Sequence, residues 1–299
     1  MRKKTIICLL SVCLSATLLL LGGCGKSNSS GGFNVIVLGA QGQGKSEVTS
    51  SIASAYGKKI SVDQLDNAKE CKSGSVIYRA ESVSIKSDSR NYNIFDLPEH
   101  RDVCKSIASQ GIVPDGAIVV TDVSGRMPAM VEQVGIIKDL GIRNVVVYIT
   151  NCTDSDLVEL LETDLKDYDF ENMHIDFIED YDNYSIENAK KTVSIMDKWT
   201  AENNVTNSVS GTAVSAYMYV LTEDEGGNYA PIFPTDELEI TVNNKTYKGT
   251  IATPDVDMMM PGDPGKTVFE LDGTASAKTG DKVTVKKDGK DVMVGVVFG

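Results

Sequence analysis

The sequence predicts an α/β protein in which a doubly wound domain is followed by a small antiparallel β-domain. Two observations carry this prediction. Over residues 33–203, short β-branched runs alternate with segments of helical periodicity, as in domains built on a parallel sheet. Over residues 204–299, short strand-like segments are separated by turn residues and helical periodicity is lost. A length of 299 residues suits one or two domains.

Five short runs in the first domain are predicted strands, and several of them are apolar on both faces, as buried parallel strands are. They are residues 34–38, 92–95, 117–121, 144–149 and 174–178. Between them, apolar residues recur at helical spacing within residues 48–55, 131–137, 157–165 and 186–196. Trp199 follows the last of these helices, and we expect it to pack where the two domains meet.

Turn residues divide the second domain into short strands of an antiparallel barrel or sandwich. The turns are Gly226-Gly227, Asn243-Asn244, Pro261-Gly262-Asp263, Asp272-Gly273 and Asp288-Gly289.

The N-terminus has the order of a secretory signal: basic residues, an apolar run over residues 6–21, and small residues before Cys24. The run is shorter than the roughly 20 residues that span a bilayer. The segment Leu21-Gly22-Gly23-Cys24 resembles the lipobox of bacterial lipoproteins, which implies a signal peptide at residues 1–23 and a lipidated Cys24. Residues 24–32 would then be a flexible tether on the extracytoplasmic face of the cell membrane. The alternatives are a transmembrane anchor with a chance cysteine, and an unprocessed signal.

The chain is acidic, with 29 basic and 42 acidic side chains and a net charge of −13. Removal of residues 1–23 leaves 26 basic side chains against the same 42 acidic ones, a net charge of −16. This balance argues against a nucleic-acid-binding surface, whose affinity comes mainly from clustered Lys and Arg. Cys71, Cys104 and Cys152 would remain as thiols, and their apolar surroundings predict buried, reduced cysteines.

A phosphate-binding motif follows the first predicted strand and precedes the first predicted helix. It reads Gly39-Ala40-Gln41-Gly42-Gln43-Gly44-Lys45-Ser46, a full match to G-x-x-x-x-G-K-S. The backbone at Gly39, Gly42 and Gly44 would surround phosphate oxygens, Lys45 would reach the terminal phosphates, and Ser46 would ligate magnesium. Asp96 ends a later strand and could hold the same ion through water. The alternative is a glycine-rich turn without a ligand.

Further segments resemble bacterial elongation factor Tu, a translational GTPase. The segments that carry the resemblance include residues 63–68, residues 96–120 and, in the second half, Met260-Pro261-Gly262-Asp263, and it extends over roughly residues 33–299. It implies a P-loop GTPase-like domain at residues 33–203 that binds GTP or GDP with Mg²⁺. It also implies that residues 204–299 form that family's C-terminal β-barrel. No segment remains for the family's middle barrel, which holds the aminoacylated end of tRNA.

The resemblance also places residues near the reacting phosphate. His100 falls where the family keeps the histidine that positions the attacking water. Glu99 replaces the glycine that meets the γ-phosphate, and Ile77 replaces the threonine that ligates magnesium. Hydrolysis is therefore expected to be weak or lost.

Guanine recognition is altered as well. The family's Asn-Lys-x-Asp aligns with Asn151-Cys152-Thr153-Asp154 if one residue is inserted, or with Thr150-Asn151-Cys152-Thr153 if none is. The first alternative makes Asn151 and Asp154 the nucleotide-binding candidates. The loop that closes the base pocket aligns with Glu179-Asp180, in an acidic group that also holds Asp176 and Asp182 and is expected to be a solvated face.

Two functions follow as hypotheses. One is a membrane-anchored, extracytoplasmic lipoprotein that binds guanine nucleotide and has weak or lost GTPase activity. The other is a non-catalytic pseudo-GTPase that serves as an interaction or adhesion scaffold for an unknown partner protein at the cell surface. Either one contacts the lipid bilayer through Cys24.

Overall fold

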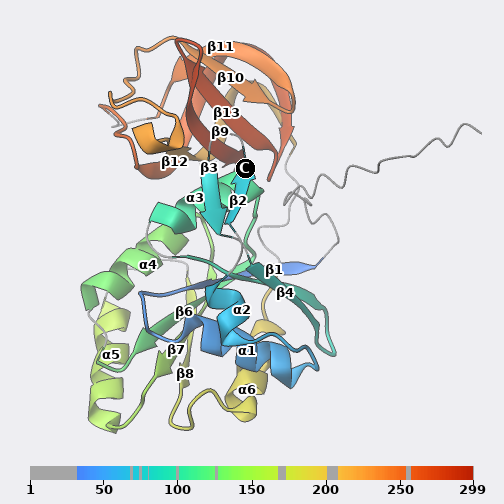
Figure 1. Cartoon of the computed structure of the whole chain (residues 1–299), viewed down its shortest axis with the longest axis vertical. Coiled ribbons are helices and arrows are strands. Elements are labelled where there is room, and N and C mark those ends of the chain that lie inside the picture. Colours follow the sequence, from blue (N-terminus) through green and yellow to red (C-terminus); the bar gives the residue numbers. More distant parts are fainter. Residues whose placement is uncertain are drawn as a thin grey trace, which may run out of the picture.

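A mixed six-stranded sheet flanked by helices is followed by a closed six-stranded barrel (Figure 1), which confirms the predicted fold class. The computed structural model describes residues 32–67, 70–73, 76–79, 81–98, 101–124, 127–167, 173–200, 208–253 and 257–298. The proposed signal, Cys24 and most of the tether lie outside the described residues, so they stay predictions. Within the described parts, no helix combines the length and apolar character that a membrane crossing needs.

The sheet has the strand order β4-β5-β1-β6-β7-β8. All five predicted strands are confirmed, and they pair in parallel. They are β1 (Phe33–Leu38), β5 (Asn91–Asp96), β6 (Gly116–Asp122), β7 (Asn144–Thr150) and β8 (His174–Glu179). The sequence analysis missed the antiparallel edge strand β4 (Glu81–Lys86), where only Val83 and Ile85 are buried.

Helices cover both faces of the sheet because alternate residues of a strand point to opposite sides. Ile36 and Leu38 lie in the core with α3, α4 and α5, whereas Val35 and Val37 lie in the core with α1, α2 and α6. The four predicted helices are confirmed as α1 (Lys45–Ala55), α4 (Met127–Asp139), α5 (Ser155–Asp167) and α6 (Ile186–Met196). Two more helices form, α2 (Val62–Asp66) and α3 (Arg101–Gln110).

Trp199 does not pack between the domains, and that prediction is wrong. Its ring lies 6.1 Å from the ring of Phe33, within the core that α1 and α6 cover. Gly116 of β6 makes room for it, because a Cβ at that glycine would fall 2.4 Å from the indole. The indole therefore closes the amino-terminal end of the sheet.

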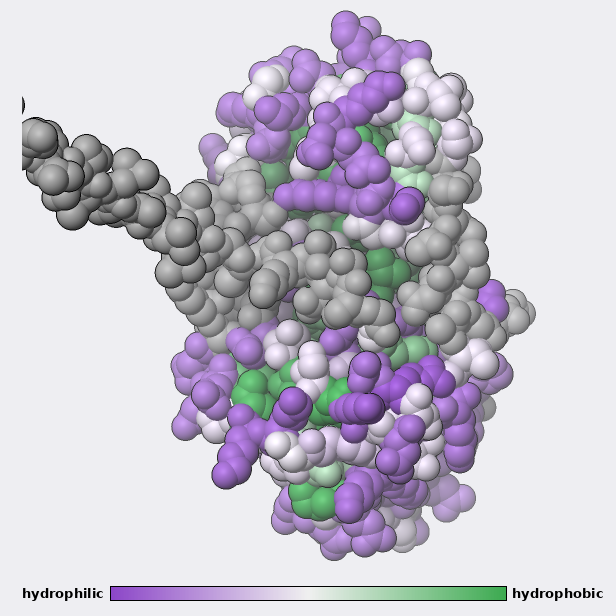
Figure 2. All heavy atoms as spheres, turned by 90° about the vertical axis from the view of Figure 1, so that its right-hand side faces the viewer, coloured by the Kyte–Doolittle hydropathy of each residue, from purple (hydrophilic) through white to green (hydrophobic). Residues whose placement is uncertain are grey.

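The second domain is a closed barrel with the strand order β10-β11-β12-β9-β14-β13, which decides between the barrel and sandwich alternatives. Its interior is apolar and includes Met218, Phe269 and Val285, all fully buried. The strands are β9 (Ser208–Val220), β10 (Leu238–Val242), β11 (Lys245–Ile251), β12 (Pro264–Lys278), β13 (Lys282–Lys287) and β14 (Lys290–Val297). The 3-10 turn η1 (Glu223–Glu225) follows β9. Figure 2 shows that hydrophilic side chains cover much of one face of both domains.

The two domains meet through α3, which lies between the sheet and the barrel in Figure 1. Cys104 and Ile107 of α3 share one buried cluster with Tyr217 of β9 and Val296 of β14. The Tyr217 hydroxyl donates to Cys104 Sγ over 3.0 Å. A short hairpin of β2 (Glu70–Ser73) and β3 (Val76–Arg79) also packs on α3.

Candidate functional site

The phosphate loop lies at the carboxyl end of β1, between that strand and α1. Gly42 and Gly44 have φ angles of 74° and 95°, in the left-handed region that glycine adopts at little cost. The side chain of Gln43 folds back, and its Oε1 accepts from the Ala40 N–H over 3.0 Å. The loop thus has the backbone shape that its glycines predict.

Lys45 begins α1, and its ammonium group turns back over the loop. Nζ donates to the carbonyl oxygens of Gly39 and Ala40, over 3.0 and 3.2 Å. The positive end of the helix dipole is at the same place, so a lysine charge and a helix N-terminus together favour an anion here.

Ser46 and Asp96 come together beside the loop, as the sequence analysis expects of a magnesium site. Ser46 Oγ donates to Asp96 Oδ2 over 2.7 Å. Burial raises the pKa of Asp96 to about 6, although the Ser46 hydrogen bond and the Lys45 charge act in the opposite direction. The other carboxylate oxygen, Oδ1, is buried and has no hydrogen-bond partner among the residues that the structure describes. A magnesium-bound water would satisfy this oxygen, so the pair fits the ion.

Thr150 connects the end of β7 to the phosphate loop. It is buried, and its hydroxyl lies 3.2 Å from the carbonyl oxygen of Gln43 and 3.3 Å from that of Thr121. The alignment without an insertion puts Thr150 at the family's asparagine position. The Thr150 hydroxyl therefore joins the end of β7 to the backbone of the phosphate loop.

Asn151 and Asp154 both lie in the exposed segment after β7. Asn151 has a φ of 55°, and its Nδ2 donates to Asp122 Oδ2. Asp154 directly precedes α5, and its Oδ1 accepts from the Asp156 N–H over 2.9 Å. Among the described residues, neither side chain forms a hydrogen bond with the phosphate loop such as the one that Thr150 forms.

Cys152 is a buried, free thiol that donates to the Ile149 carbonyl oxygen. Burial raises the pKa of this thiol to about 11, which makes it inert. Cys104 is also buried and forms no disulfide among the described residues, so the expectation of buried, reduced cysteines is confirmed for these two. The side chain of Cys71 lies outside the described part of the chain.

Asp180 is not part of a solvated acidic face, and that expectation is wrong for this residue. It is 1% exposed and organises the loop that follows β8. Its carboxylate accepts from the Tyr184 N–H over 2.6 Å, the Asn188 amide over 2.9 Å and the Asp182 N–H over 3.3 Å. These hydrogen bonds fix the conformation of the polar turn that follows β8.

Tyr184 is the site residue that sequence reasoning missed. Its phenol lies against Gly44, because a Cβ on that glycine would fall 2.3 Å from the phenolic oxygen. Burial raises the pKa of Tyr184, and the nearby carboxylates of Glu47, Asp180 and Asp122 raise it further. Glu47 belongs to the first turn of α1, so acidic groups also surround the phosphate loop.

Three sequence assignments cannot be placed. Glu99 and His100 lie outside the described residues, and so does the side chain of Ile77, whose backbone pairs with Lys72 in the β2–β3 hairpin.

A comparison with protein families adds to this geometry. The model of the elongation factor Tu GTP binding domain matches residues 32–227. The match covers the whole α/β domain, including the phosphate loop, Asp96 and Tyr184, and extends through β9 and η1. With more than half of its length matched, the chain belongs to the family of the elongation factor Tu GTP-binding domain.

Proposed function

We propose that this protein is a lipid-anchored, extracytoplasmic protein whose elongation factor Tu-type domain binds guanine nucleotide with Mg²⁺ and hydrolyses GTP slowly or not at all. The observation that carries the nucleotide part is the Ser46–Asp96 pair beside an intact phosphate loop, with one carboxylate oxygen that no described residue satisfies.

Each residue of the loop has a task in this proposal. Backbone N–H groups at Gly39, Gly42 and Gly44 surround the phosphates, and Lys45 neutralises their charge. Ser46 and Asp96 hold magnesium, which when bound offsets the negative charge of the phosphate oxygens. Asn151 and Asp154 stay candidates for binding the guanine base. The buried Thr150 supports the loop through its contact with the Gln43 carbonyl oxygen.

Weak or lost hydrolysis is supported by the chain's departures from the family pattern. Glu99 puts a carboxylate where a backbone N–H should meet the terminal phosphate, and two negative charges in a low-dielectric site repel. Ile77 has no oxygen with which to bind magnesium. His100 alone would then remain to position water.

The membrane address is supported by the N-terminal sequence pattern, and few residues separate Cys24 from the fold. The first described residue is Gly32, and β1 begins at Phe33. Residues 25–31 span at most roughly 25 Å when fully extended, at about 3.5 Å per residue. Lipidation of Cys24 would therefore keep the nucleotide-binding domain close to the bilayer.

Thermal unfolding of residues 25–299 tests the nucleotide part. GDP or GTP with magnesium should raise the melting temperature, because a ligand that binds only the folded state stabilises it. Lys45→Ala should lose this increase, measured against its own melting temperature without ligand. If no nucleotide changes the melting temperature of the wild-type protein, the proposal is wrong.

The second candidate is a non-catalytic scaffold that binds a partner protein at the cell surface. It is favoured by the contact of Tyr184 with Gly44, which fills part of the loop, and by the tightly packed seam between α3 and the barrel. GTP turnover that Lys45→Ala abolishes would exclude this candidate.

A further inference from the structure

The phenol of Tyr184 occupies the space on one side of the phosphate loop. Measured from an ideal Cβ on Gly44, the phenolic oxygen is at 2.3 Å and two ring carbons, Cε1 and Cζ, are at 2.9 Å. Glycine in this position of the motif lets the ligand approach the backbone closely. The side chain of Tyr184 therefore fills the space beside the Gly44 Cα, next to the backbone that would surround a phosphate chain.

Three contacts hold Tyr184 in this place. Its N–H donates to the buried Asp180 over 2.6 Å, and its carbonyl accepts from the Ser51 hydroxyl of α1 over 2.7 Å. The phenol also faces the side chain of Thr150. The backbone of Tyr184 is therefore fixed by Asp180 and by Ser51 of α1. The tip of its ring lies against Gly44 of the loop.

The backbone conformation is itself unusual. Asn183 and Tyr184 have φ angles of 52° and 62°, and an aromatic residue in the left-handed region costs of order 1–3 kcal/mol. Such strain persists where surrounding contacts over-determine the conformation, and it concentrates at ligand-binding sites. Here the Asp180 carboxylate and Ser51 supply those contacts.

We propose that Tyr184 is a gate on the phosphate loop: with its ring against Gly44 it excludes the nucleotide, which binds only after the ring turns away. The proposal rests on the proposed function for the class of ligand. The anchored backbone would stay in place, and rotation about the side-chain bonds would exchange the Thr150 and Gly44 contacts for a position outside the loop. Because the closed state excludes the ligand, the apparent affinity equals the affinity of the open state multiplied by the fraction of molecules that are open.

Calorimetric titration of residues 25–299 with GDP and magnesium tests the gate. Tyr184→Ala should bind at least tenfold more tightly than the wild-type protein, because the closed state no longer exists. Tyr184→Phe should bind with intermediate affinity, since it keeps the ring but loses the oxygen nearest to Gly44. Tyr181→Ala is the matched control, a tyrosine of the same loop that is 48% exposed, and its affinity should equal that of the wild type.

The possible outcomes separate the gate from the proposed function. If the wild type and both Tyr184 variants bind GDP equally, or the variants bind less tightly, the gate is wrong and nucleotide binding stands. If none of them binds, both proposals are wrong. If only the variants bind, the gate stands and nucleotide binding by the wild-type chain is wrong. Should Tyr184→Ala not fold, Tyr184→Phe decides alone, with at least a threefold gain expected and an unchanged affinity against the gate.

Discussion

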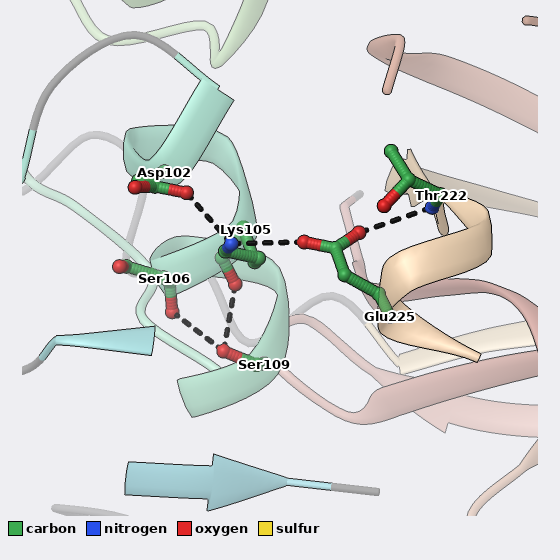
Figure 3. A network of polar contacts seen from close by, with 6 residues as sticks. All are labelled: Asp102, Lys105, Ser106, Ser109, Thr222 and Glu225. Carbon is green, nitrogen blue, oxygen red and sulfur yellow. Dashed lines mark hydrogen bonds and ion pairs between the residues drawn. The ribbon is translucent and has the colours of Figure 1, made fainter. Parts of the chain in front are cut away.

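Lys105 of α3 and Glu225 of η1 form an ion pair of 2.9 Å that joins the nucleotide-binding domain to the barrel (Figure 3). The same ammonium group lies 2.7 Å from Asp102, and the other oxygen of Glu225 accepts from the Thr222 N–H over 3.0 Å. The side chains of Lys105 and Glu225 are only 12% and 14% exposed. Since α3 follows the segment that contains Asp96, this pair fixes the element next to the candidate site against the second domain.

Lys105→Ala should destabilise the protein by about 1–3 kcal/mol, because it leaves the carboxylate of Glu225 largely buried without its cation. Urea unfolding measures the loss. The control is Lys166→Ala, which removes a 3.1 Å pair with Glu162 from a lysine that is 62% exposed. It should change stability by less than about 0.5 kcal/mol. Equal losses of unfolding free energy would show that the ion pair between the domains contributes no more to stability than the exposed pair.

The contribution of Glu225 should depend on pH. Burial alone would raise the pKa of Glu225, but hydrogen bonds from Lys105 and Thr222 hold it below the ordinary value of 4.5. A carboxyl whose pKa is lower in the folded state stabilises the fold above its unfolded pKa and loses this contribution as the pH falls through the folded pKa. Glu225→Gln should therefore be less stable than the wild type near neutral pH, and the difference should shrink at pH values well below 4.5. A difference that does not change with pH would contradict the ion pair.

Gly44→Ala should cost more stability than Gly42→Ala. Both substitutions place a side chain at a positive φ, which costs about 1–2 kcal/mol. At Gly42 a Cβ meets no atom of the described residues within 4 Å, whereas at Gly44 it collides with the Tyr184 hydroxyl. In a Tyr184→Ala background, the excess cost at Gly44 should disappear, which a double-mutant cycle of unfolding free energies measures. Strict additivity would show that the two residues do not touch.

Cys24→Ala should prevent incorporation of labelled fatty acid and release the protein from the membrane fraction, because the thiol of that residue is the predicted lipid attachment site. Cys13→Ala is the control, since that cysteine lies inside the predicted signal peptide and should leave labelling unchanged. If Cys24→Ala leaves both the label and the location unchanged, the lipoprotein proposal is wrong.

The sequence predicts the parallel strands and the phosphate loop well, because both are local signals. A run such as residues 144–149 is apolar on both faces, and the glycines of the loop mark its backbone. The edge strand β4 is not predicted because it lacks a continuous apolar run. Its buried residues, Val83 and Ile85, alternate with exposed ones. Trp199 is misplaced because a buried indole looks the same in sequence whichever core it fills.

The site is predicted less completely, because several of its contacts join distant parts of the chain. Ser46 and Asp96 are found through their motifs, although they are 50 residues apart. The contact of Tyr184 with Gly44 has no such signal, since a left-handed tyrosine has no sequence signature and the turn is set by the buried Asp180. Thr150 is likewise recognised only when its hydroxyl is seen beside Gln43.

The most direct test of the account is a calorimetric titration of the wild-type protein and Lys45→Ala, over residues 25–299, with GDP and magnesium. We expect the wild type to bind with a micromolar or lower dissociation constant, which is about −8 kcal/mol or better, and Lys45→Ala to lose binding. Absence of heat with the wild type, or equal binding by the two proteins, would contradict the assignment of this loop to a nucleotide.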